Sequence, residues 1–253
     1  MSKRGQLAIW VIIALVLAAS ILIFFMLRRG PNLFRTPEPG IIDAQTFIEQ
    51  CTEKNTQEAL NIMLPQGGFV SPRNTKRYNN TNVEYLCENI GSYDPCINQH
   101  PMLLNEMKKE IGDYLYGNIA DCFFDLQKEA EKRQGNISYG SILINVSLVP
   151  NKVKVKIIRS TTVSTKQETR TYDEFDVDVM SPAYDLAIVA TEIAAQEAKY
   201  CYFENVGYHL LYPRFSITRY SFPESTKIYT IRDTKTGKYM MVATRSCAIP
   251  SGL

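Results

Sequence analysis

The sequence has few of the side chains that enzymes most often use for proton transfer and metal binding. It contains only two histidines, His100 and His209, and neither stands in a hydrolase, β-lactamase or metalloprotease motif. None of its six cysteines forms a CxxC pair, so the usual zinc-ligand spacings are missing. We therefore predict that the chain is not an enzyme, and we assign no catalytic, cofactor-binding or metal-binding residue.

Basic residues are scarce outside the first 35 positions. Five of the 28 lysines and arginines lie there without any acidic residue, namely Lys3, Arg4, Arg28, Arg29 and Arg35. The remaining chain holds 23 basic against 26 acidic residues, a net charge of −3. Because nucleic-acid binding needs a basic surface, we expect no nucleic-acid partner.

One uncharged apolar stretch, from Leu7 to Leu27, dominates the start of the chain. At ~1.5 Å per residue a helix of this length is roughly 31 Å long, which matches the thickness of a bilayer core. The stretch is longer than the core of a secretory signal, and no small-x-small cleavage site follows it. We expect residues 1–29 to be a retained transmembrane anchor in the lipid bilayer and residues 30–40 to be a Pro/Gly linker.

The cysteines and sequons decide the predicted side of the membrane. The basic residues on the two sides of the apolar stretch are nearly equal in number. By the positive-inside rule they alone would slightly favour an internal location for the domain. Six widely spread cysteines suit disulfides in an oxidising compartment, and Asn79, Asn136 and Asn145 stand in N-x-[ST] sequons as glycosylation candidates. We expect a cytoplasmic N-terminus and an external domain at 41–253, with buried thiols in a reducing compartment as the alternative.

The domain is expected to begin with two packed helices. Asp43 suits the cap of a helix that ends near residue 64, and Pro101 precedes a second helix at about 102–133. Both helices carry apolar residues at helical spacing. Cys51 and Cys122 lie on the apolar sides of these helices, so a disulfide between them is the simplest pairing.

The segment between the helices, residues 66–100, has a mostly irregular pattern with a short strand near 83–86. Cys87 and Cys96 could close a small loop there. Cys201 and Cys247, which bracket the C-terminal part of the chain, are the third candidate pair. The sequence leaves the connectivity of all six cysteines open.

From Ser138 onward the apolar period changes from 3.6 to 2. Segments 142–148, 153–157 and 168–180 alternate apolar and polar residues, which predicts an antiparallel meander with one wet face. The wet side carries a row of lysines on the second strand and a row of aspartates on the third, which could face each other. The acidic residues lack EF-hand spacing, so we interpret them as a solvated strand face and not as a metal site. They are Asp173, Glu174, Asp176 and Asp178.

The C-terminal part returns from helix to strand. Ser181-Pro182 suits the start of a helix that runs to about residue 200. A strand at 215–220 and a hairpin of 227–232 and 238–245 follow, with Gly237 in the turn. This part is rich in tyrosine, which we interpret as sheet packing in preference to a recognition surface. These residues are Tyr200, Tyr202, Tyr208, Tyr212, Tyr220, Tyr229 and Tyr239.

The predicted fold class is α+β. It comprises an N-terminal transmembrane helix, two packed helices, an antiparallel β-meander, a further helix and a C-terminal β-hairpin. Within the external domain, residues 41–135 form the helical part and residues 136–253 the sheet part.

Two resemblances add to this interpretation. The anchor, the motifs FIEQC (47–51) and LPQGGF (64–69), and the helix that carries Cys122 resemble single-pass membrane proteins of small-genome archaea, a family with no assigned activity. The start of the chain, KRGQ, resembles the class III signal of archaeal type IV pilins, which implies cleavage between Gly5 and Gln6. Trp10 stands where that family usually has an acidic residue.

These observations together predict a single-pass cell-membrane protein with an external domain. We expect that domain to be a non-enzymatic binding, adhesion or scaffold module with a protein partner at the cell surface. A pilin-like filament or secretion subunit is the alternative. The sequence defines neither the ligand nor the oligomeric state.

Overall fold

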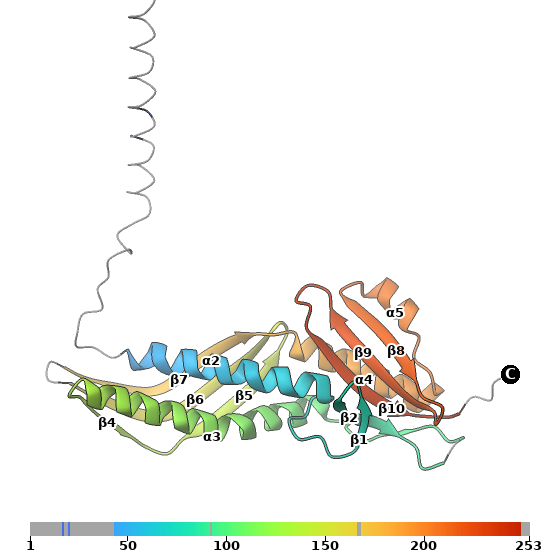
Figure 1. Cartoon of the computed structure of the whole chain (residues 1–253), viewed down its shortest axis with the longest axis horizontal. Helices are drawn as coiled ribbons and strands as arrows, with labels where there is room; N and C mark the ends of the chain where they lie inside the picture. Colours follow the sequence, from blue (N-terminus) through green and yellow to red (C-terminus); the bar gives the residue numbers. More distant parts are fainter. Residues whose placement is uncertain (1–16, 18–19, 21–42, 92, 166–167, 249–253) are drawn as a thin grey trace, which may run out of the picture. The chain divides into compact units, whose positions relative to one another are not determined.

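The computed structural model describes residues 17, 20, 43–91, 93–165 and 168–248 (Figure 1). The chain divides into two units, Met1–Ile41 and Ile42–Leu253. The first unit holds only two described residues, Leu17 and Ser20, so the predicted anchor and linker otherwise lie outside the described part of the chain. Among the described residues, no helix is both long and apolar enough to cross a membrane.

The second unit begins with the two helices that the sequence predicts. Helix α2 (Ala44–Met63) starts at Asp43, whose side chain accepts a hydrogen bond from the backbone N–H of Thr46. It ends in a short 3-10 turn, η2 (Leu64–Gln66), which Gly67 closes in a left-handed conformation. Helix α3 (Leu103–Lys132) packs beside α2. Its predicted apolar stripe, which includes Met107, Ile111, Leu115, Ile119 and Leu126, is buried.

A four-stranded antiparallel sheet lies against these helices (Figure 1). It consists of β4 (Asn136–Tyr139), β5 (Leu143–Val149), β6 (Lys152–Ser164) and β7 (Thr169–Met180). β6 pairs with β7 on one side and with β5 and β4 in succession on the other. The meander prediction is confirmed for β5, β6 and β7, and β4 is an additional strand.

The solvent face of this sheet carries the two predicted charge rows. Lys154 lies opposite Asp178 and Lys156 lies opposite Asp176 in the register of β6 and β7. The ion pairs themselves run diagonally, because Lys152 Nζ lies 2.5 Å from Asp178 Oδ2 and Lys156 pairs with a glutamate of β7. These side chains are partly exposed, so each pair adds only a few tenths to about 1 kcal/mol.

A second, six-stranded sheet forms the other part of the unit. Its strands are β1 (Thr75–Tyr78), β2 (Thr81–Glu88), β3 (Ile97–Asn98), β8 (Phe215–Ser221), β9 (Thr226–Asp233) and β10 (Tyr239–Arg245). The order is β1-β2-β10-β9-β8, and β3 pairs with the free part of β2. β2 and β10 are parallel, although about 160 residues separate them along the chain. Helix α4 (Ala183–Tyr200) packs on β10, β9 and β2, and the short helix α5 (Asn205–Leu211) lies beside β8.

The six-stranded sheet corrects two expectations. The hairpin of β9 and β10 is confirmed, with Gly237 at φ +71°, but it is part of a larger sheet. The segment 66–100 holds three strands, β1, β2 and β3, where the sequence indicated a single short strand near 83–86. β1 and β2 form a hairpin that turns on Asn79 and Asn80, both at positive φ, a conformation that asparagine tolerates well in such turns.

One hydrophobic core connects both sheets. It includes Phe123 and Phe175 between α3 and the four-stranded sheet, and Phe203 and Tyr229 beside the six-stranded sheet. The predicted division into a helical part at 41–135 and a sheet part at 136–253 is therefore not the one observed. Strands from both ranges complete the same sheet.

Candidate functional site

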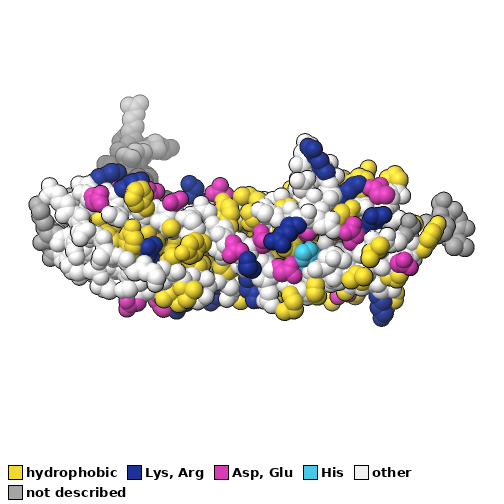
Figure 2. Space-filling model, turned by 90° about the horizontal axis from the view of Figure 1, so that it is seen from below, with side chains coloured by type: hydrophobic (Ala, Val, Ile, Leu, Met, Phe, Trp, Pro, Cys, Tyr) yellow, Lys and Arg dark blue, Asp and Glu magenta, His cyan; other side chains and the backbone are white. Residues whose placement is uncertain are grey.

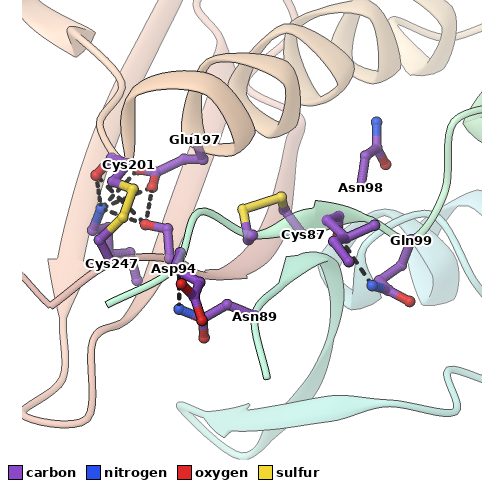
Figure 3. Close-up of a disulfide and its surroundings, with 12 residues drawn as sticks. Cys87, Asn89, Asp94, Asn98, Gln99, Glu197, Cys201 and Cys247 are labelled. Atoms are coloured by element: carbon purple, nitrogen blue, oxygen red, sulfur yellow. Dashed lines mark hydrogen bonds and ion pairs between the residues drawn. A yellow bond between two sulfur atoms is a disulfide. The ribbon is translucent and has the colours of Figure 1, made fainter. Parts of the chain in front are cut away.

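All six cysteines are paired, and the described residues contain no free cysteine. The disulfide prediction is confirmed by the pairs Cys51–Cys122, Cys87–Cys96 and Cys201–Cys247. The first pair joins α2 to α3, and the second closes the loop after β2. The third joins the end of α4 to the chain after β10, with Cys87 nearby (Figure 3). These are the pairings that the cysteine positions suggested from the sequence.

The three sequon asparagines all lie on the surface. Asn79 is at the tip of the β1–β2 hairpin, Asn136 begins β4, and Asn145 points from the solvent face of β5. Each side chain is exposed, so glycan attachment at these positions stays a prediction that the fold permits. The predicted cleavage point, Gly5 and Gln6, lies outside the described residues.

His100 lies in a cavity of about 240 Å³ between β2 and α3. Its Nδ1 lies 2.5 Å from Glu106 Oε2, and its Nε2 lies 3.6 Å from Glu84 Oε1. The Phe69 ring packs on the imidazole with 4.7 Å between centroids. Burial opposes the charged imidazolium, but the contacts with Glu84 and Glu106 outweigh burial and raise the pKa of His100.

Two of the carboxylates that line this cavity, Glu84 and Glu110, have backbone partners. Glu84 accepts hydrogen bonds from two N–H groups of the loop before β1, and Glu110 accepts them from the N–H groups of Val70 and Ser71. Burial would raise the pKa of Glu84, but His100 and these N–H groups lower it. The cluster therefore fixes the loop between η2 and β1. No serine, threonine or cysteine side chain of the described residues is hydrogen-bonded to His100.

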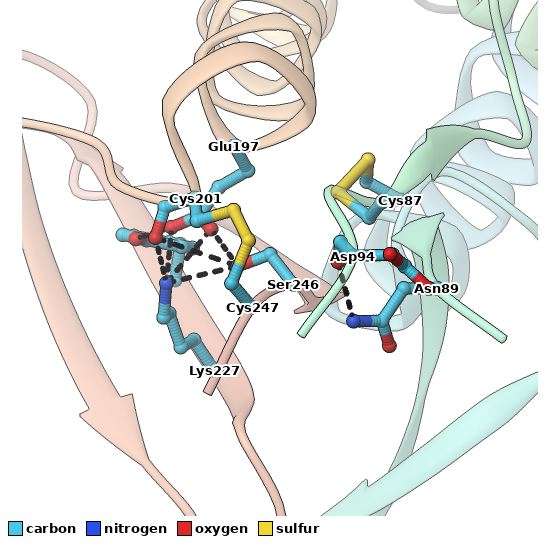
Figure 4. Close-up of polar contacts among 10 residues, drawn as sticks. Cys87, Asn89, Asp94, Glu197, Cys201, Lys227, Ser246 and Cys247 are labelled. Carbon is cyan, nitrogen blue, oxygen red and sulfur yellow. Dashed lines mark hydrogen bonds and ion pairs between the residues drawn. A yellow bond between two sulfur atoms is a disulfide. The ribbon is translucent and has the colours of Figure 1, made fainter. Parts of the chain in front are cut away.

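A second polar cluster lies at the end of α4 (Figure 4). Lys227 Nζ donates hydrogen bonds to Glu197 Oε2 at 2.8 Å, to the carbonyl of Cys201 at 2.6 Å and to Ser246 Oγ at 3.1 Å. The hydroxyls of Ser246 and Tyr229 both donate to Glu197. Burial and the neighbouring Glu197 carboxylate raise the pKa of Tyr229, so its hydroxyl stays protonated.

This cluster is closed to substrates. A serine within 3.1 Å of a lysine has the composition of a nucleophilic dyad, but Ser246 and Glu197 have no exposed surface. Both hydroxyl donors are directed at the Glu197 carboxylate. We assign the cluster a structural role, because it fixes the end of α4 to β9 beside the Cys201–Cys247 disulfide.

A third ion-pair cluster connects α4 with β8 and β9. Arg214 Nη2 lies 2.8 Å from Asp233 Oδ2 and 3.1 Å from Asp185 Oδ2. Burial would raise the pKa of Asp233, but the hydrogen bonds from Arg214 and from backbone N–H groups lower it. The same Asp185 oxygen accepts a bond from the N–H of Asn151 in the β5–β6 turn. Asp185 is therefore held in one place by both sheets.

Helix α5 is attached to the edge of β8 by its polar side chains. Asn205 Nδ2 donates to the carbonyl of Ile217 at 3.2 Å, and His209 Nδ1 lies 2.8 Å from the carbonyl of Phe215. His209 therefore donates a hydrogen bond to a backbone carbonyl of the edge strand β8. Glu204 caps the helix by accepting from two N–H groups of its first turn.

Between α4 and α5 lies an open groove of about 620 Å³, which we name the α4–α5 groove. Its apolar lining is Tyr184, Ile188, Val189, Tyr208, Leu211, Tyr212 and Phe215, and its polar lining is Asp185, Glu192 and Gln196. Leu211 is 76% exposed and Tyr212 is 52% exposed, which is unusual for large apolar side chains beside a concave surface. This groove is the best candidate for a binding site.

The tyrosine interpretation needs correction here. Tyr229 packs in the sheet core as expected, but Tyr208 and Tyr212 lie on or next to α5 and line the groove. These two tyrosines therefore line a groove and are not packed in a sheet, which the sequence favoured. The segment 205–211, with Val206, Leu210 and Leu211, is too short for its helical period to be visible.

Charge gives no competing site on the surface that Figure 2 shows. Basic and acidic side chains are interspersed on that face. Among the described residues, no group of three or more histidine, cysteine, aspartate or glutamate side chains is arranged to hold a metal ion.

The fold and groove define a disulfide-closed α+β domain with two sheets. Comparison with models of known protein families, with curated proteins and with solved structures finds no match. The chemistry of the groove and the three disulfides are therefore the features that bear on function.

Proposed function

We propose that residues 43–248 form an external, non-enzymatic binding module, that residues 1–29 anchor it in the cell membrane, and that the α4–α5 groove is its binding surface. The observation that carries this proposal is the groove itself. It is a concave surface where large apolar side chains stay exposed, whereas the polar clusters at His100 and Glu197 are occupied by the protein's own groups.

The groove has the rigidity that selective binding requires. Asp185 is fixed by Arg214 and by the β5–β6 turn, and α5 is fixed by Asn205 and His209 on β8. Side chains that are already ordered lose little conformational entropy when a ligand binds. The groove therefore supports binding better than an equal area of mobile loop would.

The external location is supported by the three disulfides. Disulfides form and persist mainly in oxidising compartments and are rare in the cytosol. The exposed sequons agree with such a location. The pilin-like alternative concerns residues 1–29 only, and no observation on the described residues favours it.

Attachment assays on intact cells that produce the full chain test this function. Leu211→Glu places a charge in the groove, and we expect it to lower attachment to other cells or to a coated surface at least tenfold. Leu143→Glu is the matched control, because Leu143 is 55% exposed on β5, outside the groove lining. Equal attachment by both variants, or failure of a membrane-impermeant amine reagent to label the domain on intact cells, would refute the proposal.

A further inference from the structure

We propose that the α4–α5 groove binds a neutral saccharide. This inference rests on the proposed binding function and names the chemical class of the ligand. Three features of the groove carry it: aromatic ring faces, polar atoms without protein partners, and the absence of a lining cation among the described residues.

Four aromatic rings line the groove, those of Tyr184, Tyr208, Tyr212 and Phe215. The rings of Tyr208 and Tyr212 are neighbours, with centroids 4.8 Å apart and planes tilted by 40°. The face of an aromatic ring is electron-rich and attracts weakly positive C–H groups. A pyranose ring presents such C–H groups on one face, so it can stack on these rings, and Tyr212 is exposed enough to receive it.

The polar atoms of the same groove suit hydroxyl groups. The phenol oxygens of Tyr184, Tyr208 and Tyr212 make no hydrogen bond to another described residue. Both contacts of Asp185 are made by Oδ2, so its Oδ1 is available. Glu192 Oε1 accepts from Gln196 at 2.7 Å, and its Oε2 is likewise available. A saccharide hydroxyl both donates and accepts, so it can use phenols and carboxylates alike.

The charge of the lining limits the ligand further. No lysine, arginine or histidine belongs to the described residues that line the groove. Arg214, the neighbouring cation, is already paired with Asp185 and Asp233. The only charged groups that an anionic ligand such as a phosphate or a uronic acid would meet in the described lining are therefore carboxylates. The volume of about 620 Å³ falls within the ~300–1,000 Å³ of small-ligand sites.

A cationic ligand is the competing class, because rings and a carboxylate also attract ammonium groups. Glu192 separates the two classes. Its replacement in Glu192→Gln removes the charge but keeps an acceptor oxygen, so it should change saccharide affinity less than threefold and weaken a cation at least tenfold.

The test uses the full chain in a polyoxyethylene detergent, which contains neither sugar nor ammonium groups. The protein is screened on an array of neutral glycans, and hits are titrated by calorimetry alongside choline. We expect at least one neutral oligosaccharide to bind. Tyr212→Ala should weaken it at least tenfold, whereas Tyr212→Phe, which keeps the ring, should weaken it less than fivefold. Tyr116→Ala, an exposed tyrosine on α3, is the matched control and should have no effect.

Several results would overturn the inference. They are binding of no neutral glycan, glycan binding that Tyr212→Ala leaves intact, choline binding that Glu192→Gln abolishes, or a dimer in sedimentation that Tyr212→Ala dissociates. Circular dichroism of each variant confirms folding. If Leu211→Glu lowers cell attachment while no glycan binds, the saccharide inference fails and the binding function stands.

Discussion

Different interactions stabilise the two sheets of this domain and the helices packed on them. The meander half, made of α2, α3 and β4–β7, is built largely from consecutive segments, and the ion pairs on its solvent face are partly exposed. The mixed-sheet half, made of β1–β3, α4, α5 and β8–β10, joins residues 75–98 to residues 215–245. It contains the buried carboxylates Glu84, Glu197 and Asp233 and two of the three disulfides.

The two halves differ in how far apart their paired segments lie in the chain, and this distance decides how much of the fold depends on individual contacts. Consecutive strands find each other through short turns, and apolar alternation is enough to set their register. Segments far apart in the chain lose more entropy when they pair. A covalent bond or a buried charge pair between such segments therefore has a larger effect on the stability of the fold. The α4–α5 groove lies in the half that is fixed in this second way.

The largest effect should come from the buried charge of the mixed-sheet half. Lys227→Met leaves the Glu197 carboxylate buried without its cation, and we expect about 3–5 kcal/mol of destabilisation in urea unfolding. Lys156→Met in the meander half removes a partly exposed pair and should cost less than about 1 kcal/mol. If both variants lost the same free energy of unfolding, the distinction between the two halves would be wrong.

Disulfides should rank by the length of chain they close. Replacing Cys51 and Cys122 together by alanine opens a separation of 71 residues, and Cys201 with Cys247 opens one of 46; each should cost about 4 kcal/mol. Cys87 and Cys96 close only 9 residues, for which we expect about 3 kcal/mol. Chemical denaturation of the three double variants measures this order. A larger loss for the short loop than for the long ones would contradict it.

The protonation of His100 should make stability depend on pH, by a smaller amount than the changes described above. Its pKa is raised in the folded state, so its contribution is complete below the unfolded value of about 6.5 and is lost as pH rises through the folded pKa. The lowered pKa of Glu84 acts oppositely, because that contribution is lost as pH falls through its folded value. His100→Gln should flatten the decline above about pH 6.5 in urea titrations. An unchanged slope in His100→Gln would exclude this assignment.

The smallest effect should be a gain in the meander half. Gly117 lies on the exposed side of α3, and a Cβ added there would meet no atom within 4 Å. Gly117→Ala should therefore stabilise the protein by about 0.5–1 kcal/mol, because alanine favours the helix. Thermal unfolding of the variant checks the sign, and a lower melting temperature would show an unseen constraint at this position.

The meander half could be predicted from the sequence because its signals are local. The helical stripe from Met107 to Leu126 lies within one helix, and the alternations at 153–157 and 168–180 each lie within one strand. The three disulfides were candidate pairs from the sequence, but their connectivity stayed open until the structure showed it. The mixed sheet could not be predicted, because the parallel pairing of β2 with β10 leaves no local pattern.

The groove could not be predicted for a related reason. Its lining comes from α4, α5 and the start of β8, and α5 is a helix of only 7 residues. Tyrosine is common in strands, so nothing in the sequence indicated that Tyr208 lies on α5 and Tyr212 at its end. The bonds of Asn205 and His209 to β8, which place this helix beside the groove, are visible only in the structure.

The thiol state of the protein in its native membrane tests the central claim most directly, that the domain is external and closed by disulfides. Membranes are solubilised in denaturant with an alkylating reagent and without reductant, and the intact mass is measured. We expect no added alkyl group, because all six cysteines are paired. A mass increase that corresponds to six alkylated thiols would place the domain in a reducing compartment and contradict the account.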